Sequence, residues 1–174
     1  MNGKLFKTLF LLLLISCVSS VFSQEATAVL TNDKNDSLGT VQFDQSDSGV
    51  VLLLDLHGLP PGTHALHIHD KGQCDAPDFK TAGGHFNPDK KMHGFLNKKG
   101  PHAGDLPNIQ VEDDGTVKTK IVTQLISLKK GDKNTILNST GTSIVIHENP
   151  DDYITDPAGA SGKRLACGSI KEKK

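Results

Sequence analysis

The sequence is short of aromatic residues and has no surplus of either charge. It contains no tryptophan and a single tyrosine, Tyr153, and its 19 basic and 20 acidic residues give a formal net charge of −1. A nucleic-acid-binding domain needs a clustered basic face, so this balance argues against that class. The longest apolar run, residues 9–15, is too short to cross a bilayer, which argues against a transmembrane helix.

The apolar run instead has the features of an export signal, because it follows two lysines and precedes small residues. Two cleavage sites fit: "LISC", which resembles a bacterial lipobox with a lipidated Cys17, and "VFS", which leaves Gln24 first. We expect residues 1–23 to be an export leader and residues 24–174 to form a periplasmic or extracellular domain. A lipid anchor at Cys17 is the alternative form of the same export.

Cysteine is scarce, with three residues in all, and Cys17 lies in the leader. In an exported protein the remaining pair, Cys74 and Cys167, is expected to form a disulfide, and two separate buried thiols are the alternative. The bridge would close a loop of about ninety residues and stabilise the folded state by roughly 4 kcal/mol in chain-entropy estimates.

Helical periodicity is absent as well, and the chain shows short apolar alternations bounded by turn residues. Seventeen glycines and eight prolines punctuate it, and there is no internal repeat or linker. This pattern is typical of a single all-β domain, an antiparallel sandwich or barrel. We expect eight short strands, at residues 26–30, 40–43, 50–56, 64–69, 116–122, 125–128, 142–147 and 164–170.

Two stretches interrupt the strand pattern, at residues 70–110 and 148–163. A loop of roughly forty residues is uncommon in a compact domain and usually has a function. Since apolar burial cannot hold such loops in place, we expect metal ligation or a disulfide to do so.

Histidines are concentrated in "HALHIH", residues 64–69. Side chains two apart on a strand point to the same face, so His67 and His69 can bind one ion together. His64 would face the other side of an unbroken strand. We interpret it, and His57 at the end of the preceding strand, as structural residues that bond to the backbone.

The long loop adds further metal-binding side chains at irregular spacing, as expected for ligands on a wrapped loop. Imidazole suits copper and zinc, and a mixed set of histidine and aspartate suits a tetrahedral structural zinc. Two four-coordinate sites need eight ligands, so one histidine is expected to serve both sites. The seven candidates are His67, His69, His85, His93, His102, Asp105 and His147.

Five motifs resemble those of the copper/zinc superoxide dismutase family, in the order typical of the family, and the resemblance covers residues 26–170. They are "HALHIH", "GGHFNP", "HAGDLPN", "VIHENPDD" and "GKRLACG". The resemblance implies an eight-stranded antiparallel Greek-key barrel or sandwich with a long metal-binding loop and a second active-site loop. It implies an antioxidant oxidoreductase with one copper and one zinc per subunit, of the exported bacterial or plant-like type.

The resemblance also assigns the ligands. Copper is expected at His67, His69, His85 and His147, and zinc at His85, His93, His102 and Asp105. Asp151 matches the aspartate that accepts hydrogen bonds from one histidine of each set, here His67 and His93. Cys74 and Cys167 match the disulfide within the subunit.

The implied reaction converts superoxide to oxygen and hydrogen peroxide while copper alternates between two oxidation states. Arg164 occupies the position that guides the anion, and His85 leaves reduced copper, takes up a proton and returns it. The loop from Asp152 to Arg164 lacks the acidic and lysine residues of the animal cytosolic enzymes. Lys163 is the candidate to replace them in part.

Two other functions compete with this one. An exported copper and zinc buffer would keep the fold without the reaction, but here every expected ligand and the guiding arginine are present. A two-metal hydrolase relies on carboxylate bridges, whereas this set is almost entirely imidazole. For assembly we expect a homodimer, with a monomer left open, and superoxide as the substrate.

Overall fold

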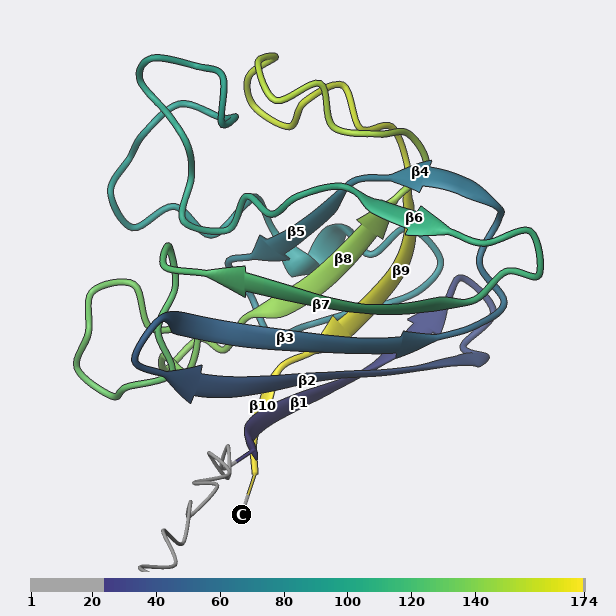
Figure 1. The fold of residues 1–174 in the computed structure, drawn as a ribbon, viewed down its shortest axis with the longest axis horizontal. Coiled ribbons are helices and arrows are strands. Elements are labelled where there is room, and N and C mark those ends of the chain that lie inside the picture. Colours follow the sequence, from purple (N-terminus) through teal and green to yellow (C-terminus); the bar gives the residue numbers. More distant parts are fainter. Residues whose placement is uncertain (1–23, 174) are drawn as a thin grey trace, which may run out of the picture.

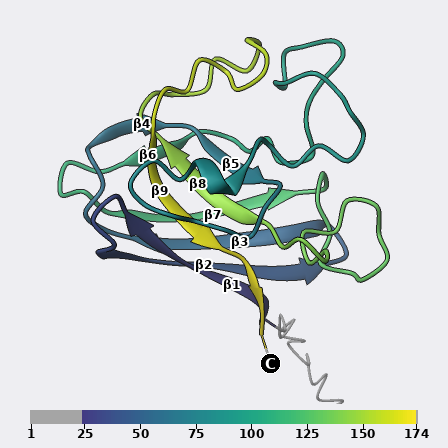
Figure 2. The same ribbon diagram turned by 180° about the vertical axis from the view of Figure 1, so that it is seen from behind.

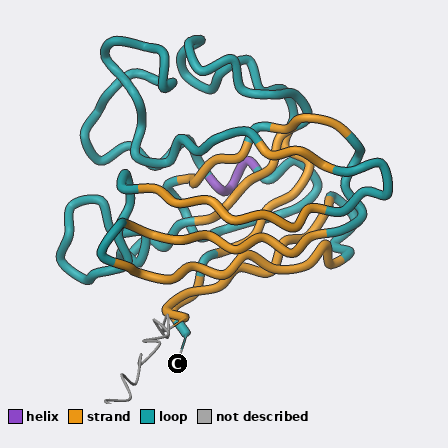
Figure 3. Tube along the Cα trace, in the orientation of Figure 1, coloured by secondary structure: helices purple, strands orange, loops and turns teal. Residues whose placement is uncertain are grey.

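The computed structural model describes residues 24–173, so the expected export leader and Cys17 lie outside the described residues. Within this range almost all regular structure is strand (Figure 3). No helix among residues 24–173 is long and apolar enough to span a membrane. The elements are β1 (Gln24–Asn32), β2 (Ser37–Ser46), β3 (Gly49–Leu56), β4 (Gly62–His64), β5 (Leu66–His69), the 3-10 helix η1 (Lys80–Ala82), β6 (Ile109–Val111), β7 (Val117–Thr123), β8 (Ser143–His147), β9 (Arg164–Ser169) and β10 (Lys171–Glu172).

The strands form one curled antiparallel sheet, with β4 and β6 as a separate two-stranded sheet (Figure 1). The order in the large sheet is β5-β8-β9-β1-β2-β3-β7, and β10 pairs with β1. This arrangement confirms the predicted all-β antiparallel fold.

Alternation along the strands builds the core beneath the curled sheet. On β2, Val41 and Phe43 are fully buried, and Phe43 lies opposite Leu52 of β3. Burying an aliphatic or aromatic side chain of this size stabilises the fold by about 1.5–3 kcal/mol. The sheet therefore holds its own shape and provides a firm base for the loops.

The predicted strand 64–69 is wrong in one respect, because it breaks at Ala65. Its first part, β4, pairs with β6, whereas β5 pairs with β8. At the break, Ala65 donates its N–H to the carbonyl of Asn149 and accepts a hydrogen bond from the N–H of His147. The chain thus passes from the small sheet to the large one through a single residue, with no turn between β4 and β5.

The predicted strand 125–128 is also wrong. Ile126 and Leu128 are buried as the alternation predicts, but the backbone around them is an irregular loop. The N–H of Leu128 donates to the side chain of Gln45 (2.9 Å), and Ser127 bonds to the turn that follows. Two strands, β6 and β10, are not among the predicted ones. They have only three and two residues, which is too few for a periodicity to be detected.

Much of both predicted loops lies on the same side of the molecule, away from the C-terminus (Figures 1 and 2). The disulfide between Cys74 and Cys167 is present, with a Cα–Cα distance of 5.6 Å, which confirms that prediction. It joins the first part of the long loop to β9. Phe79, Ala82 and Val145 pack beside it in a small apolar cluster of their own.

Candidate metal centre

Strands β5 and β8 present three histidines to one place. His67 and His69 alternate with buried Leu66 and Ile68 and therefore share a face of β5. His147 ends β8, and its Nε2 lies 3.4 Å from the Nε2 of His69. A backbone bridge between His69 and His85 brings the long loop against the same strand.

These four histidines form the first group, because one ring nitrogen of each lies within 4.8 Å of the others. Two nitrogens, Nδ1 of His67 and Nε2 of His85, are buried and have no hydrogen-bond partner. Buried polar atoms are nearly always satisfied, and an orphan costs about 1–3 kcal/mol. An ion bound by this all-imidazole set would satisfy both atoms, so the residues fit a copper site.

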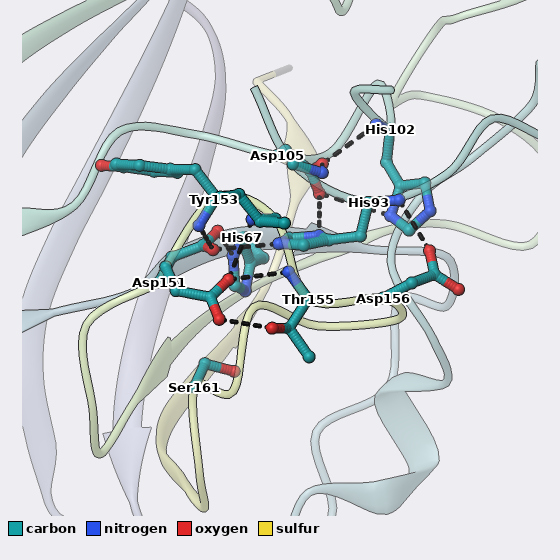
Figure 4. Close-up of polar contacts among 12 residues, drawn as sticks. His67, His93, His102, Asp105, Asp151, Tyr153, Thr155, Asp156 and Ser161 are labelled. Carbon is teal, nitrogen blue, oxygen red and sulfur yellow. Dashed lines mark hydrogen bonds and ion pairs between the residues drawn. The ribbon is translucent and has the colours of Figure 1, made fainter. Parts of the chain in front are cut away.

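The second group converges on Asp105, as Figure 4 shows for three of its members. The Oδ1 atom of Asp105 lies 2.9 Å from Nδ1 of His85, 3.1 Å from Nδ1 of His93 and 3.4 Å from Nδ1 of His102. Nδ1 of His102 is also 3.4 Å from Nδ1 of His85. Three imidazoles and one carboxylate are a set that suits tetrahedral zinc.

His67 also lies close enough to be counted with His85, His93 and Asp105. Its Nε2, however, donates to Asp151 (2.8 Å), which leaves only Nδ1 free. That free atom belongs to the first group, with His69, His85 and His147. We therefore count His102, rather than His67, as the fourth member of the second group, with His85, His93 and Asp105.

The electrostatics of the second group favour a cation. Burial alone would raise the pKa of Asp105, but hydrogen bonds from the three histidines and the N–H of Gly94 outweigh it and hold that pKa well below its usual range. Burial alone would lower the pKa of His93, but Asp105 and Asp151 together raise it to about 9. A site that stabilises positive charge on a ring nitrogen also suits a metal ion.

Asp151 connects the two groups (Figure 4). Its Oδ2 accepts a hydrogen bond from Nε2 of His67 (2.8 Å), and its Oδ1 accepts one from Nε2 of His93 (3.0 Å). These are the two bonds that the family resemblance implies. Because each ring uses Nε2 toward Asp151, its Nδ1 is the nitrogen that a metal ion could bind.

Asn108 holds Asp151 in place, and sequence reasoning missed this residue. Its Oδ1 accepts the N–H of Asp151 (2.8 Å), and its Nδ2 donates to the carbonyl of Asp151 (3.0 Å). The N–H of Asn108 donates to the Tyr153 hydroxyl (2.7 Å). The signal in the sequence was its place as the last residue of the motif "HAGDLPN".

The two loops contact each other at Gly94 and Tyr153. Gly94 has φ +99°, and a Cβ there would clash with the carbonyl oxygen of Tyr153. That carbonyl accepts the N–H of Leu96 (3.0 Å), and the rings of Phe95 and Tyr153 lie 5.5 Å apart. Glycine is therefore required at position 94 for the loops to close over the metal residues.

Replacing Asp151 with asparagine should weaken metal binding by about 10–100-fold, the usual cost of removing a residue that orients ligands. An amide oxygen can accept from one ring, but the NH2 group cannot accept from the other. Competition with a chelator for copper and zinc measures the effect. The exposed Asp113→Asn is the control of equal charge, and equal affinities in the two variants would contradict the orienting role.

Two other histidines lie outside both groups. His64 places Nδ1 2.8 Å from the carbonyl oxygen of His147 and Nε2 2.9 Å from that of Pro60, which confirms its structural interpretation. His57 is exposed just after β3. Ser161, which the sequence did not single out, is buried with its hydroxyl 3.1 Å from Nδ1 of His147, so Nε2 of that ring faces the first group.

Arg164 begins β9 and is fixed by two carbonyls of the long loop. Its Nη1 donates to Phe79 (2.5 Å) and its Nη2 to Gly83 (2.6 Å). Gly83 also accepts from Nδ1 of His69 (3.0 Å), so one carbonyl orients both side chains. Burial lowers the pKa of the Arg164 guanidinium, which nevertheless stays charged at any ordinary pH.

An open cavity of about 730 Å³ leads to the first group. Its wall includes His69, His85, His147 and Arg164, so three imidazole rings and a cation line the same space. Lys163, the candidate for anion guidance, lines a neighbouring hollow instead. A small anion entering the cavity would meet Arg164 beside the histidines.

Comparisons with known proteins agree with this geometry. The family described as copper/zinc superoxide dismutase (SODC) matches residues 37–170. A protein named superoxide dismutase [Cu-Zn] 1 from Aquifex aeolicus is 50% identical over 145 residues, which cover 83% of this chain and 86% of that protein.

Solved structures with the same fold include a superoxide dismutase-like protein from Bacillus subtilis, in a double mutant in which a tyrosine and a proline are each replaced with histidine. It superposes with a TM-score of 0.82 at 44% identity, and the match covers 84% of this chain and 98% of that one. The Cu/Zn superoxide dismutase from Brucella abortus gives a TM-score of 0.69 at 27% identity, over 84% of this chain and all of that one.

Proposed function

Since the chain belongs to the copper/zinc superoxide dismutase family, we propose that it dismutes superoxide outside the cytoplasm, with one copper and one zinc as cofactors. Copper would be held by His67, His69, His85 and His147, and zinc by His85, His93, His102 and Asp105. The observation that carries the proposal is His85, whose Nδ1 faces Asp105 while its buried Nε2 is unpaired beside the other histidines. One ring can thus serve both metals.

The balance of the reaction defines what the protein must provide. Two superoxide ions and two protons give one oxygen and one hydrogen peroxide, so one electron moves from the first superoxide to the second. Bound copper supplies the one-electron redox couple for this transfer, and bound zinc supplies fixed charge without changing oxidation state. The protein has to attract the anion, keep the rings oriented and deliver protons.

Arg164 attracts and orients the substrate. Its guanidinium lies in the cavity wall with the three histidines that face it, and both of its outer nitrogens are tied to backbone carbonyls. The cation therefore keeps one position without relying on an acidic partner that would cancel its charge. Superoxide is small enough to contact this charge and the histidine nitrogens together.

His85 handles one of the protons. Its Nδ1 is oriented by Asp105, and its Nε2 is the buried nitrogen that can hold a proton when it is not bound to a metal. Asp151 orients the neighbouring rings of His67 and His93 through hydrogen bonds to their Nε2 atoms. The ring can therefore take up and release a proton at Nε2 without moving away from Asp105.

Replacing Arg164 with alanine should lower kcat/KM for superoxide on the order of tenfold, the effect of one half-buried cation next to a reacting anion. Arg164→Lys should keep part of the rate, because the charge remains while the forked contacts to two carbonyls are lost. Pulse radiolysis measures the rates, and the metal content of each variant should match the parent. Equal rates in all three proteins would contradict the guiding role.

An exported metal buffer is the second candidate, because the two groups of metal-binding side chains would serve it equally well. A buffer would need the histidines and Asp105 but not Arg164. Arg164 is the only arginine in the sequence, and its side chain lies in the cavity wall beside three of those histidines. This placement favours the enzyme.

We propose that the protein acts in the periplasm or outside the cell. The Cys74–Cys167 disulfide supports this location, since such bonds persist in oxidising compartments. Residues 1–23 carry the two alternative export signals, so a lipid anchor at Cys17 and a soluble form are both consistent with it. Mass spectrometry of the exported protein would distinguish them, and a homodimer is the proposed assembly.

A further inference from the structure

The second loop provides little positive charge to the metal cavity. Its only basic residue before Arg164 is Lys163, which lines the neighbouring hollow rather than the cavity. The same loop contributes a carboxylate, Asp156, to the cavity wall. From this loop and the start of β9, Arg164 is thus the only cation in the cavity wall.

The long loop supplies another cation to the cavity wall, Lys91. This residue of the long loop lines the cavity together with Asn87, His85 and His102. Its side chain is exposed and forms no ion pair among residues 24–173; the nearby carboxylate of Asp89 is paired with Lys133 instead. Its charge is therefore available to an anion that enters the cavity.

Asn87 fixes the backbone of Lys91 at this place. The Oδ1 of Asn87 accepts the N–H of Lys91 (3.0 Å), and its Nδ2 donates to the carbonyl of Lys91 (2.8 Å). Lys90, between them, has φ +55° and donates its N–H to the carbonyl of Asn87 (3.2 Å). This tight turn directs the chain so that position 91 lies at the cavity wall, while Lys90 does not line it.

The charges of the cavity wall therefore sum in favour of an anion. Two cations, Lys91 and Arg164, face one carboxylate, Asp156. The Oδ1 of Asp156 accepts a hydrogen bond from the backbone N–H of His93 (2.7 Å). This bond offsets part of the negative charge of the carboxylate. The lysine lies in the long loop and the arginine begins β9, so two separate segments supply the positive charge of the cavity wall.

We propose that Lys91 is a substrate-guiding residue, in the role that the sequence suggested for Lys163. It draws superoxide toward the cavity and leaves the final orientation to Arg164. This inference rests on the proposed dismutase function. The inference goes beyond that function because it assigns the guiding charge to a residue of the long loop.

The test compares Lys91→Gln with Lys98→Gln in protein loaded with copper and zinc. Both substitutions remove one exposed lysine of the same loop, so the net charge of the two variants is equal, but Lys98 does not line the cavity. At an ionic strength of about 0.01 M we expect kcat/KM for superoxide to fall about two- to threefold in Lys91→Gln, as for one charge near an anion in water. The Lys98→Gln variant should keep a kcat/KM close to that of the parent protein.

Salt gives a second readout, because screening removes the contribution of an exposed charge. The rate of the parent should fall more steeply with ionic strength than that of Lys91→Gln. Azide, followed by the absorption of the copper-loaded protein, provides a readout that does not need turnover. Its dissociation constant should rise about two- to threefold in Lys91→Gln alone.

The outcomes separate the two claims. Equal rates, salt slopes and azide affinities in Lys91→Gln and Lys98→Gln would overturn the guiding role while the dismutase function stands. A parent protein that binds both metals but does not dismute superoxide would overturn the function. A selective loss of azide affinity in Lys91→Gln would then still support an anion-guiding lysine.

Discussion

Replacing His147 with alanine should reduce superoxide dismutation by more than about 100-fold, since even residues that only orient a metal ligand cost 10–100-fold. His147 ends β8 with its Nε2 3.4 Å from that of His69. Its removal takes one nitrogen from the histidine group but leaves the group around Asp105 intact. Copper content should therefore fall while zinc content stays near one per subunit.

The fold should survive this change. The backbone N–H and carbonyl of His147 bond to Ala65 and to the ring of His64, and alanine keeps both contacts. Zinc content near one per subunit thus separates loss of a ligand from loss of the fold. The exposed His57→Ala is the control, and a His147→Ala protein with parental copper and activity would show that His147 is not a ligand.

Replacing both Cys74 and Cys167 with serine should lower the free energy of unfolding by roughly 4 kcal/mol, the chain-entropy value for a closed loop of this length. For a chain of this size that corresponds to a melting temperature about 10 °C lower. The bridge joins the start of the long loop to β9, and Arg164 in β9 bonds to Phe79 and Gly83 within that loop. Dismutation should therefore fall as well, because the guiding cation loses its fixed supports.

A reductant provides the internal control for this prediction. It should lower the melting temperature of the parent protein to that of the double serine variant, and it should leave the variant unchanged. Calorimetry with and without reductant gives both values. A variant as stable as the oxidised parent would show that the loop is held by its other contacts.

The sequence predicts the part of the site that follows strand periodicity. "HIH" places His67 and His69 on one face, and the strands around them are recognisable by alternation. The break at Ala65 could not be predicted in this way, because the residues on both sides continue the same alternation while their partners, β6 and β8, are distant in the sequence. Likewise, Ile126 and Leu128 alternate like a strand, but side-chain bonds replace the ladder.

Loop geometry limits prediction most strongly. The proposed ligands on the long loop follow from residue type and from the resemblance, whereas Asn108 and Asn87 act through contacts that no spacing rule describes. Lys163 is adjacent to Arg164 in the sequence, so it was the natural candidate for a guiding charge. The start of β9 and the turn at Asn87 instead direct Lys163 to another hollow and Lys91 to the cavity.

One sample of the protein, reconstituted with copper and zinc, tests the central claim most directly. Its metal content and its rate of superoxide dismutation should be measured together. We predict one copper and one zinc per subunit and rapid dismutation that is lost when copper alone is removed. Two bound metals without dismutation would contradict the enzyme function and indicate an exported metal buffer.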